Sequence, residues 1–202
     1  MIRAVISDLG KVVLWFDNAI FLRQLAERAG RPFADVKAAA HGDIGLLQRF
    51  DAGAVTPAGF RDEVLARIGA DVPYDEFYRM YNDIFTPNPA AIEVLARVKA
   101  AGLKLLLLSN TDPERFGFVR RRFPEVGLFD AFVLSYELKL LKPDPAIYRA
   151  AARAAGCAPA ECAFIDDMEE NVAGAAAAGL SAVLYRPGTD LAAELKKLGL
   201  RL

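Results

Sequence analysis

Residues 2–10, IRAVISDLG, decide the fold, because a short apolar run there ends directly in an acidic loop. Residues 2–6 are mostly apolar and include β-branched side chains, which predicts a buried strand. Asp8 and Gly10 follow the run and are typical of a loop. The stretch therefore predicts a buried strand that delivers the carboxylate of Asp8 to the loop after it.

Four later segments also consist of an apolar run followed by residues that end it, and helical stretches lie between these segments. Each helical stretch begins with a capping side chain and a proline, at Asn88-Pro89, Asp112-Pro113 and Asp144-Pro145. Strand and helix therefore alternate from about residue 88 onward. This alternation predicts a parallel sheet with helices on both faces. The apolar runs are residues 103–108, 131–134, 162–165 and 180–184.

Residues 17–86 interrupt the alternation. Helical patterns cover residues 17–29, 33–40, 56–68 and 73–85, and no convincing apolar strand lies between them. The later strands still need residues 2–6 as a partner. We therefore expect a discontinuous α/β core, residues 1–16 and 87–202, with an all-helical cap, residues 17–86, inserted after the first strand.

Polar side chains follow the predicted strands or open the helices after them. Because the carboxyl ends of parallel strands meet at one crevice, we expect these side chains to share a site. Crowded carboxylates favour a hard divalent ion such as Mg²⁺, and a hydroxyl and a lysine favour an anion. A phosphoryl group facing a carboxylate nucleophile suits that set. The residues are Asp8, Ser109, Asn110, Lys142, Asp166 and Asp167.

The chain resembles the haloacid dehalogenase-like superfamily of hydrolases, in the branch with a helical cap after the first motif. The four motifs occur in order and span nearly the whole chain. The resemblance implies a three-layer Rossmann-like α/β core with an inserted helical cap, and a phosphatase similar to bacterial sugar-phosphate phosphatases. The motifs are residues 7–13 (SDLGKVV), 107–110 (LLSN), 142–148 (KPDPAIY) and 164–167 (FIDD), the last with Asn171 and Ala178-Gly179.

The resemblance also implies a metal site for Mg²⁺. Asp8 matches the nucleophile and a metal ligand, and the backbone carbonyl of Gly10 matches a second ligand. Asp167 matches a direct metal ligand, and Asp166 one that binds directly or through water. A helix N-cap pair is the structural alternative for these last two acids.

The remaining matches hold the phosphoryl group of a small phosphorylated substrate. Ser109, Asn110 and Lys142 match the residues that bind phosphoryl oxygens, and Asn171 matches one that orients the lysine or the acidic loop. Ser109 capping its own turn and a solvated Lys142 are the structural alternatives.

Gly10 departs from the family pattern, which usually has a second Asp there to protonate the leaving group. Lys11 also replaces the more usual Gly. General acid catalysis contributes about 10²- to 10⁴-fold, so its loss favours a substrate with a readily departing group, such as an anomeric sugar, acyl or aryl phosphate. Asp17 and His41 are candidate substitutes for the missing acid.

Two other functions remain open. A 2-haloacid dehalogenase shares the aspartate and the lysine, but its relatives carry neutral residues where this chain has Asp166 and Asp167. A degenerate member that only binds a phosphorylated ligand is possible because of Gly10. A receiver-type phospho-acceptor fits less well, since its paired acids follow the first strand.

The composition of the chain narrows the classes of partner and the cellular location that we expect. The net charge of −1 gives no electrostatic footprint for nucleic acid or an anionic membrane. The longest nearly apolar stretch, residues 172–185, is too short to cross a bilayer, and the N-terminus lacks a signal peptide's apolar segment. We expect a cytoplasmic protein. Cys157 and Cys162 fit neither a disulfide framework nor a zinc site.

Overall fold

The computed structural model describes the backbone of residues 1–41 and 44–202, and the side chains of residues 1–39 and 45–202. Within them, the central sheet has five parallel strands in the order β5-β4-β1-β6-β7. The expected α/β core is therefore confirmed. Its strands are β1 (Ala4–Ser7), β4 (Lys104–Ser109), β5 (Ala131–Leu134), β6 (Cys162–Asp166) and β7 (Ser181–Leu184).

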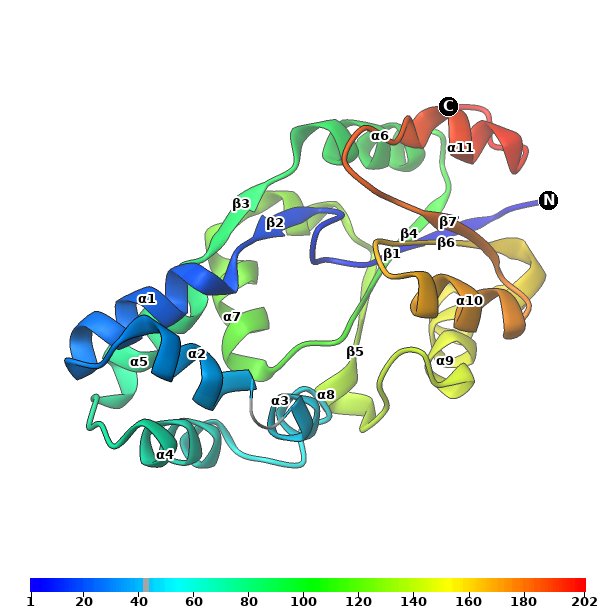
Figure 1. Cartoon of the computed structure of the whole chain (residues 1–202). Coiled ribbons are helices and arrows are strands. Elements are labelled where there is room, and N and C mark those ends of the chain that lie inside the picture. Colours follow the sequence, from blue (N-terminus) through cyan, green and yellow to red (C-terminus); the bar gives the residue numbers. More distant parts are fainter. Residues whose placement is uncertain (42–43) are drawn as a thin grey trace.

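Helices cover both faces of this sheet, as Figure 1 shows. One face packs on α6 (Pro89–Ala100), α7 (Pro113–Arg122) and α11 (Leu191–Lys197), and the other on α9 (Pro145–Ala155) and α10 (Glu169–Ala177). Successive strand residues serve opposite faces: Val5 packs with the first group and Ile6 with the second. Because both faces of the sheet are buried, each strand is a continuous run of apolar residues in the sequence. Short elements complete the core: η1 (Pro124–Leu128), α8 (Ser135–Leu138) and η2 (Pro159–Glu161).

The cap helices, α1 to α5, form a separate unit with its own apolar cluster. Phe50 is fully buried there and stacks on Phe60 with ring centroids 4.3 Å apart. Figure 1 shows these helices at one end of the molecule, away from α9 to α11. They are α1 (Asn18–Ala29), α2 (Phe33–His41), α3 (Ile44–Asp51), α4 (Pro57–Ile68) and α5 (Tyr74–Asn82). Helix α3 was not predicted, and the helix expected over residues 73–85 ends earlier.

A short antiparallel ribbon joins the two units. It consists of β2 (Leu14–Phe16) and β3 (Phe85–Pro87), and Phe16 pairs with Phe85. The expectation that residues 17–86 hold no strand is therefore wrong at their end. The ribbon marks where the chain leaves the core and returns. The exact division at residues 16 and 87 stays a prediction.

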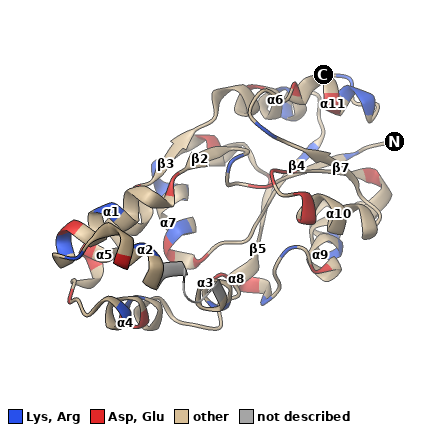
Figure 2. Cartoon of the chain, in the orientation of Figure 1, with Lys and Arg blue, Asp and Glu red and all other residues tan. Residues whose placement is uncertain are grey.

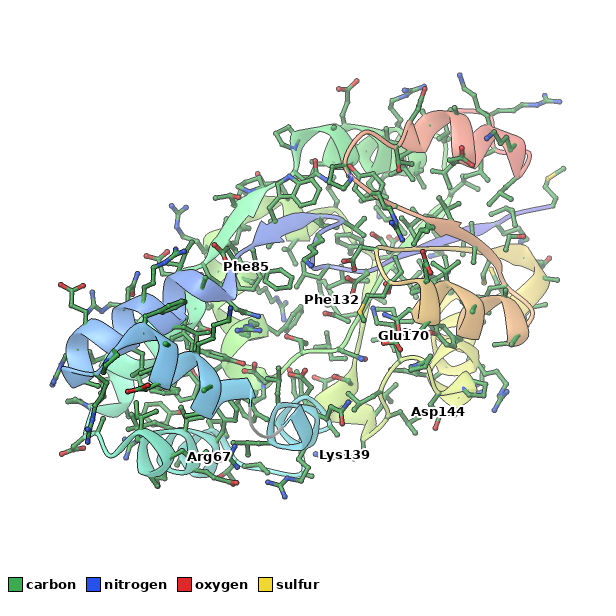
Figure 3. The ribbon with its side chains drawn as sticks, in the orientation of Figure 1. Arg67, Phe85, Phe132, Lys139, Asp144 and Glu170 are labelled. Atoms are coloured by element: carbon green, nitrogen blue, oxygen red, sulfur yellow. The ribbon has the colours of Figure 1, made fainter. Side chains whose placement is uncertain are left out.

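The cap helices also contact the core at a second place, which we call the cap–core seam: Asp51, Tyr81, Thr111, Asp112, Arg115 and Ser135. Ser135 Oγ donates a hydrogen bond to the carbonyl of Asp51 at 2.6 Å and accepts one from the Thr111 amide at 2.9 Å. Tyr81 Oη donates to Asp112 Oδ2 at 3.0 Å. Beside the seam, Lys139 Nζ donates to the Gly53 carbonyl at 2.8 Å (Figure 3).

Two of the three predicted proline caps form as expected, and the third does not. Asp112 accepts a hydrogen bond from the Arg115 amide at 2.9 Å, and Asp144 accepts one from the Ala146 amide at 2.7 Å. The Asn88 side chain instead donates to the Val12 carbonyl at 2.7 Å and to Tyr185 Oη at 2.9 Å. It therefore ties the end of the ribbon to the core.

Among the described helices, none has the length and apolar character needed to cross a membrane.

Candidate active site

The strand register gathers the predicted site residues at the carboxyl end of the sheet. Ser7 of β1 lies opposite Leu107 of β4 and Ile165 of β6, so the residues just beyond these positions become neighbours. Asp8 follows β1, Ser109 ends β4, and Asp166 ends β6. Lys142 reaches the same place from the loop between α8 and α9. Positions far apart in the sequence thus share one site, as expected.

Lys142 is the centre of this site. Its Nζ lies 2.6 Å from Asp8 Oδ1 and 2.6 Å from Asp166 Oδ2, and it also donates to the Leu108 carbonyl at 3.4 Å. Only 5% of Lys142 is exposed, so it is not a solvated surface lysine. Burial alone would lower the pKa of Lys142, but Asp8 and Asp166 raise it above its usual value. The lysine is therefore a fixed positive charge between two carboxylates.

Several hydrogen bonds fix the carboxylate of Asp166. Besides Lys142, its carboxylate accepts hydrogen bonds from Asn171 Nδ2 at 3.0 and 3.1 Å and from the Met168 amide at 2.8 Å. The Met168 amide lies ahead of α10, whose first residue is Glu169 and whose N-cap is Met168. The helix-cap alternative therefore does not describe Asp166. Asn171 orients the acidic loop, which is one of the two roles that the resemblance implied.

Asp8, Asp166 and Asp167 form a cluster whose ligand atoms all lie within 4.8 Å of one another. Burial raises the pKa of Asp8 to about 7, with Lys142 opposing the rise and Asp166 adding to it. Burial, and then Asp166, also raise the pKa of Asp167. Figure 2 shows further acidic residues at the start of α10. A hard cation bound to Asp8 and Asp167 would relieve this crowding, so these carboxylates fit Mg²⁺.

The residues expected to hold phosphate lie beside Lys142. Ser109 is buried, and its Oγ makes only a long 3.5 Å contact with the Asn110 carbonyl. The Asn110 side chain donates to the Lys142 carbonyl at 3.1 Å and accepts from the Lys142 amide at 2.9 Å. Asn110 therefore fixes the backbone of Lys142, ahead of a cis Lys142–Pro143 bond. The Asn110 side chain therefore positions the lysine, and among the described residues the Ser109 hydroxyl has only the long contact with the Asn110 carbonyl.

Phe16 fills the space beside Gly10. A Cβ on Gly10 would lie 2.8 Å from Phe16 Cε1, which is too close for two carbon atoms. Lys11 is left-handed, with φ of 56°, and its Nζ lies 3.9 Å from Asp167 Oδ2 and 5.5 Å from the Phe16 ring centroid. The Phe16 ring therefore crowds the space that a Cβ on residue 10 would enter, and the Lys11 ammonium group lies next to that ring.

Of the two candidate substitutes for the missing acid, Asp17 and His41, only Asp17 has a described side chain. Asp17 is exposed and accepts a hydrogen bond from the Ala19 amide at 2.8 Å, which makes it the N-cap of α1. The side chain of His41 lies outside the described residues.

Sequence reasoning did not single out three residues that support the site. Tyr148 Oη donates to the Asn171 carbonyl at 2.8 Å, and the Phe164 ring centroid lies 5.6 Å from Lys142 Nζ. The third residue, Phe16, borders Gly10. Tyr148 and Phe164 lie inside the quoted motifs, so their places in those motifs were the available signal. Nothing in the sequence pairs Phe16 with Gly10.

A family model described as a haloacid dehalogenase-like hydrolase matches residues 2–179. The chain belongs to the haloacid dehalogenase-like hydrolases. Among the relatives of this hydrolase is a phosphorylated carbohydrates phosphatase of Thermotoga maritima, 28% identical over 90% of this chain and 83% of the relative. The expected family and the assignment as a hydrolase with phosphatase relatives are confirmed.

Solved structures agree with this family. A HAD family enzyme from Bacteroides thetaiotaomicron, in complex with magnesium and inorganic phosphate, matches the hydrolase with a TM-score of 0.84 at 27% identity, covering 96% of this chain and 99% of that one. L-2-haloacid dehalogenase from Xanthobacter autotrophicus, with chloropropionic acid covalently bound, has a TM-score of 0.68 at 21% identity, covering 98% and 83% of the two chains. The second likeness concerns the fold alone.

Proposed function

We propose that the chain is a Mg²⁺-dependent phosphatase that hydrolyses a small phosphorylated metabolite through an aspartyl-phosphate on Asp8. The observation that carries the proposal is the buried contact of Lys142 Nζ with both Asp8 and Asp166, at 2.6 Å each. Asp167 lies beside this pair. A fixed cation next to a carboxylate nucleophile and a metal-binding acid suits transfer of a phosphoryl group.

The reaction takes place in two displacements. A carboxylate oxygen of Asp8 attacks phosphorus and forms an O–P bond, while the bond from phosphorus to the leaving-group oxygen breaks. Water then attacks the same phosphorus and the Asp8 O–P bond breaks, which releases phosphate and restores the Asp8 carboxylate. The attacking water gives up a proton to solvent, and the departed alkoxide takes one up from solvent. Bound Mg²⁺ supplies positive charge against the phosphoryl oxygens. Lys142 and the Ser109 hydroxyl hold these oxygens from the protein side, and Asn110 and Asn171 keep the lysine and Asp166 in place.

The raised pKa of Asp8, about 7, bears on how it becomes a nucleophile. The carboxylate must be ionised to attack, and a divalent ion at Asp167 and Gly10 favours the ionised form. A Mg²⁺ ion held there would add to the effect of Lys142, which also favours the ionised form of Asp8.

The environment of Gly10 supports a substrate whose alcohol leaves without strong protonation. Gly10 has no acidic side chain, and a Cβ at this position would lie 2.8 Å from Phe16 Cε1. An anomeric sugar phosphate, an acyl phosphate or an aryl phosphate meets this requirement better than a primary alkyl phosphate. The Thermotoga maritima relative, named for phosphorylated carbohydrates, adds support for a sugar phosphate within this set.

The test measures phosphate release from nitrophenyl phosphate with and without Mg²⁺, beside chloride release from chloropropionate. We expect Mg²⁺-dependent phosphate release, its loss in Asp8→Asn, and no change in Asp190→Asn, a matched substitution at an exposed helix cap. Chloride release without metal would identify a dehalogenase instead. Vanadate binding with no turnover of any phosphorylated metabolite would identify a degenerate binding protein.

A further inference from the structure

Helix α10 lies very close to the loop that carries Lys142. The two meet at Gly174, which lies within α10, and at Pro143, the residue after Lys142. A Cβ added to Gly174 would lie 2.8 Å from Pro143 Cβ and 2.8 Å from the Pro143 carbonyl oxygen. Non-bonded carbon atoms in contact are normally about 3.5–4.0 Å apart. Glycine at this position therefore allows α10 to approach the loop.

The same side of α10 also faces the end of β6. Asn171 lies three residues before Gly174, so the two positions lie on one side of the helix. Asn171 Nδ2 donates to both carboxylate oxygens of Asp166, at 3.0 and 3.1 Å. Tyr148 Oη, from α9, donates to the Asn171 carbonyl at 2.8 Å, and Figure 1 shows α9 and α10 on the same face of the sheet. The position of α10 is therefore linked both to Asp166 and to the loop that carries the lysine.

The loop cannot move away from Gly174 without moving Lys142. The Asn110 side chain already holds the backbone of Lys142, through hydrogen bonds of 3.1 Å to its carbonyl and 2.9 Å from its amide. At the same time, Lys142 Nζ lies 2.6 Å from Asp8 Oδ1. A shift of Pro143 would therefore change the position of the ammonium group relative to Asp8.

The third neighbour of Gly174, Tyr148, has no room to move away either. A Cβ on Gly174 would lie 3.1 Å from Tyr148 Cε2, and Tyr148 is fully buried. Its ring packs edge-on against Phe164 with centroids 5.3 Å apart, and the Phe164 centroid lies 5.6 Å from Lys142 Nζ. A movement of α10 itself would draw Asn171 away from the carboxylate that it holds. Each way of making room for a side chain at residue 174 therefore displaces a residue of the site.

We propose that Gly174 is a positioning residue: because it has no side chain, α10 can fix the position of Lys142 beside Asp8. Gly174 acts through Pro143 and Asn171. The inference rests on the proposed function, in which Lys142 holds the phosphoryl oxygens. A misplacement of about 1 Å at a reacting centre can lower a rate by about 100-fold. A single methyl group at residue 174 therefore lowers activity from outside the site.

Gly174→Ala tests the proposal, and Gly117→Ala is the matched control. Gly117 lies within α7, and a Cβ there would lie 3.3 Å from Arg121 Nη1, the end of a flexible side chain. Both substitutions favour the helix, since alanine is the better helix former. The full chain is assayed for kcat with nitrophenyl phosphate at saturating Mg²⁺, for inhibition by inorganic phosphate and for its melting temperature.

We expect Gly174→Ala to lower kcat by about tenfold or more and to weaken inhibition by phosphate by about tenfold. Gly117→Ala should change neither. A purely structural role would lower the melting temperature of Gly174→Ala and leave its kcat per folded molecule and its phosphate inhibition unchanged, and this result would overturn the inference.

A second variant covers the case in which Gly174→Ala does not fold. Tyr148→Phe frees the Asn171 carbonyl from α9 without adding an atom next to α10. We expect it to lower kcat by about threefold or more. An unchanged kcat in Tyr148→Phe would show that the contacts of α10 do not position the site.

The unmodified protein separates this inference from the proposed function. Mg²⁺-dependent phosphate release at the same kcat in the unmodified protein and in folded Gly174→Ala would overturn the positioning role alone. No phosphate release from the unmodified protein would overturn the proposed function and the inference with it.

Discussion

The two neighbouring acids Asp166 and Asp167 differ sharply in their surroundings. Asp166 is fully buried and bonded to Lys142, Asn171 and Met168, whereas Asp167 is partly exposed and lies 3.9 Å from Lys11. The sequence could place both at the site, because both follow an apolar run. It could not separate their tasks, since these depend on hydrogen bonds from distant segments.

The first prediction is that Asp167→Asn raises the Mg²⁺ concentration for half-maximal activity by about tenfold or more, because it removes a charge open to the ion. Asp166→Asn should instead lower kcat at saturating Mg²⁺, because Lys142 loses a partner. Activity is titrated with Mg²⁺ in both variants, with Asp190→Asn as the control, to test these two expectations. Equal shifts in the two titrations would contradict this division of roles.

The second prediction concerns Gly10 and Phe16. We expect Gly10→Asp alone not to restore general acid catalysis. The Cβ of the substituted residue would lie 2.8 Å from Phe16 Cε1, which leaves no room for the side chain. The double variant with Phe16→Ala has room for the carboxyl group. We expect it to flatten the dependence of kcat/KM on leaving-group pKa across a series of phosphate esters.

The control for that experiment is Phe16→Ala alone, which should keep the steep dependence of the unmodified protein. An unmodified protein that hydrolyses alkyl and aryl phosphates equally fast would show that another acid protonates the leaving group.

At the scale of elements, the sequence predicted what depends on periodicity and missed what depends on contacts. The core strands and the helices between them were predicted within a few residues. Strands β2 and β3 have three residues each, too few for alternation to show. Helix α3 has eight residues and buries Leu46 and Phe50 against other helices. Helices this short depend on tertiary packing.

The cap–core seam was likewise invisible in the sequence. Its members come from α3, α5, α7, α8 and the loop ahead of α7, and only Asp112 was singled out, as a helix cap. The structure adds a second acid, the half-buried Asp51, beside it. Burial, then Asp112, raise the pKa of Asp51 to about 7, and Arg115 opposes the rise.

The third prediction follows from this raised pKa. Between pH 4 and 7 the folded state keeps a proton on Asp51 that the unfolded state has released, so stability falls as pH rises through this range. Asp51→Asn removes this fall. We expect the free energy of unfolding of Asp51→Asn, relative to that of the unmodified protein, to rise by on the order of 1 kcal/mol between pH 5 and pH 8.

Urea unfolding at the two pH values measures this difference. Asp62→Asn, at an exposed position on α4, serves as the control, because its carboxyl group stays in water. A parallel pH dependence in Asp51→Asn and the unmodified protein would show that Asp51 ionises normally.

At the scale of the whole molecule, the chain holds separate apolar clusters for the cap helices and for the sheet. The break in strand–helix alternation after residue 16 predicts a division into core and cap, which stays a prediction. How the two units are joined was not predictable. The ribbon and the cap–core seam both rest on hydrogen bonds between residues far apart in sequence.

The fourth prediction is that Phe50→Ala weakens the cap helices more than the sheet. Removing a fully buried, stacked ring costs about 3–5 kcal/mol. We expect hydrogen exchange to accelerate in α1, α4 and α5 while the amides of β1, β4 and β6 keep their protection. Gln48→Ala, exposed on the same helix, should change neither group. Uniform loss of protection would mean that the two units unfold as one.

The antiparallel ribbon also has a consequence for how such a chain can diversify. Phe16 and Phe85 are paired, so everything between them leaves and re-enters the core at one point. Paired antiparallel residues are about 4.5–5.5 Å apart, and the entropy of closing a loop rises only slowly with its length. A helical unit of different size could be spliced between the two strands without moving the sheet. Recombination there would exchange the helical unit while leaving Asp8, Lys142 and Asp166 in place at the end of the sheet.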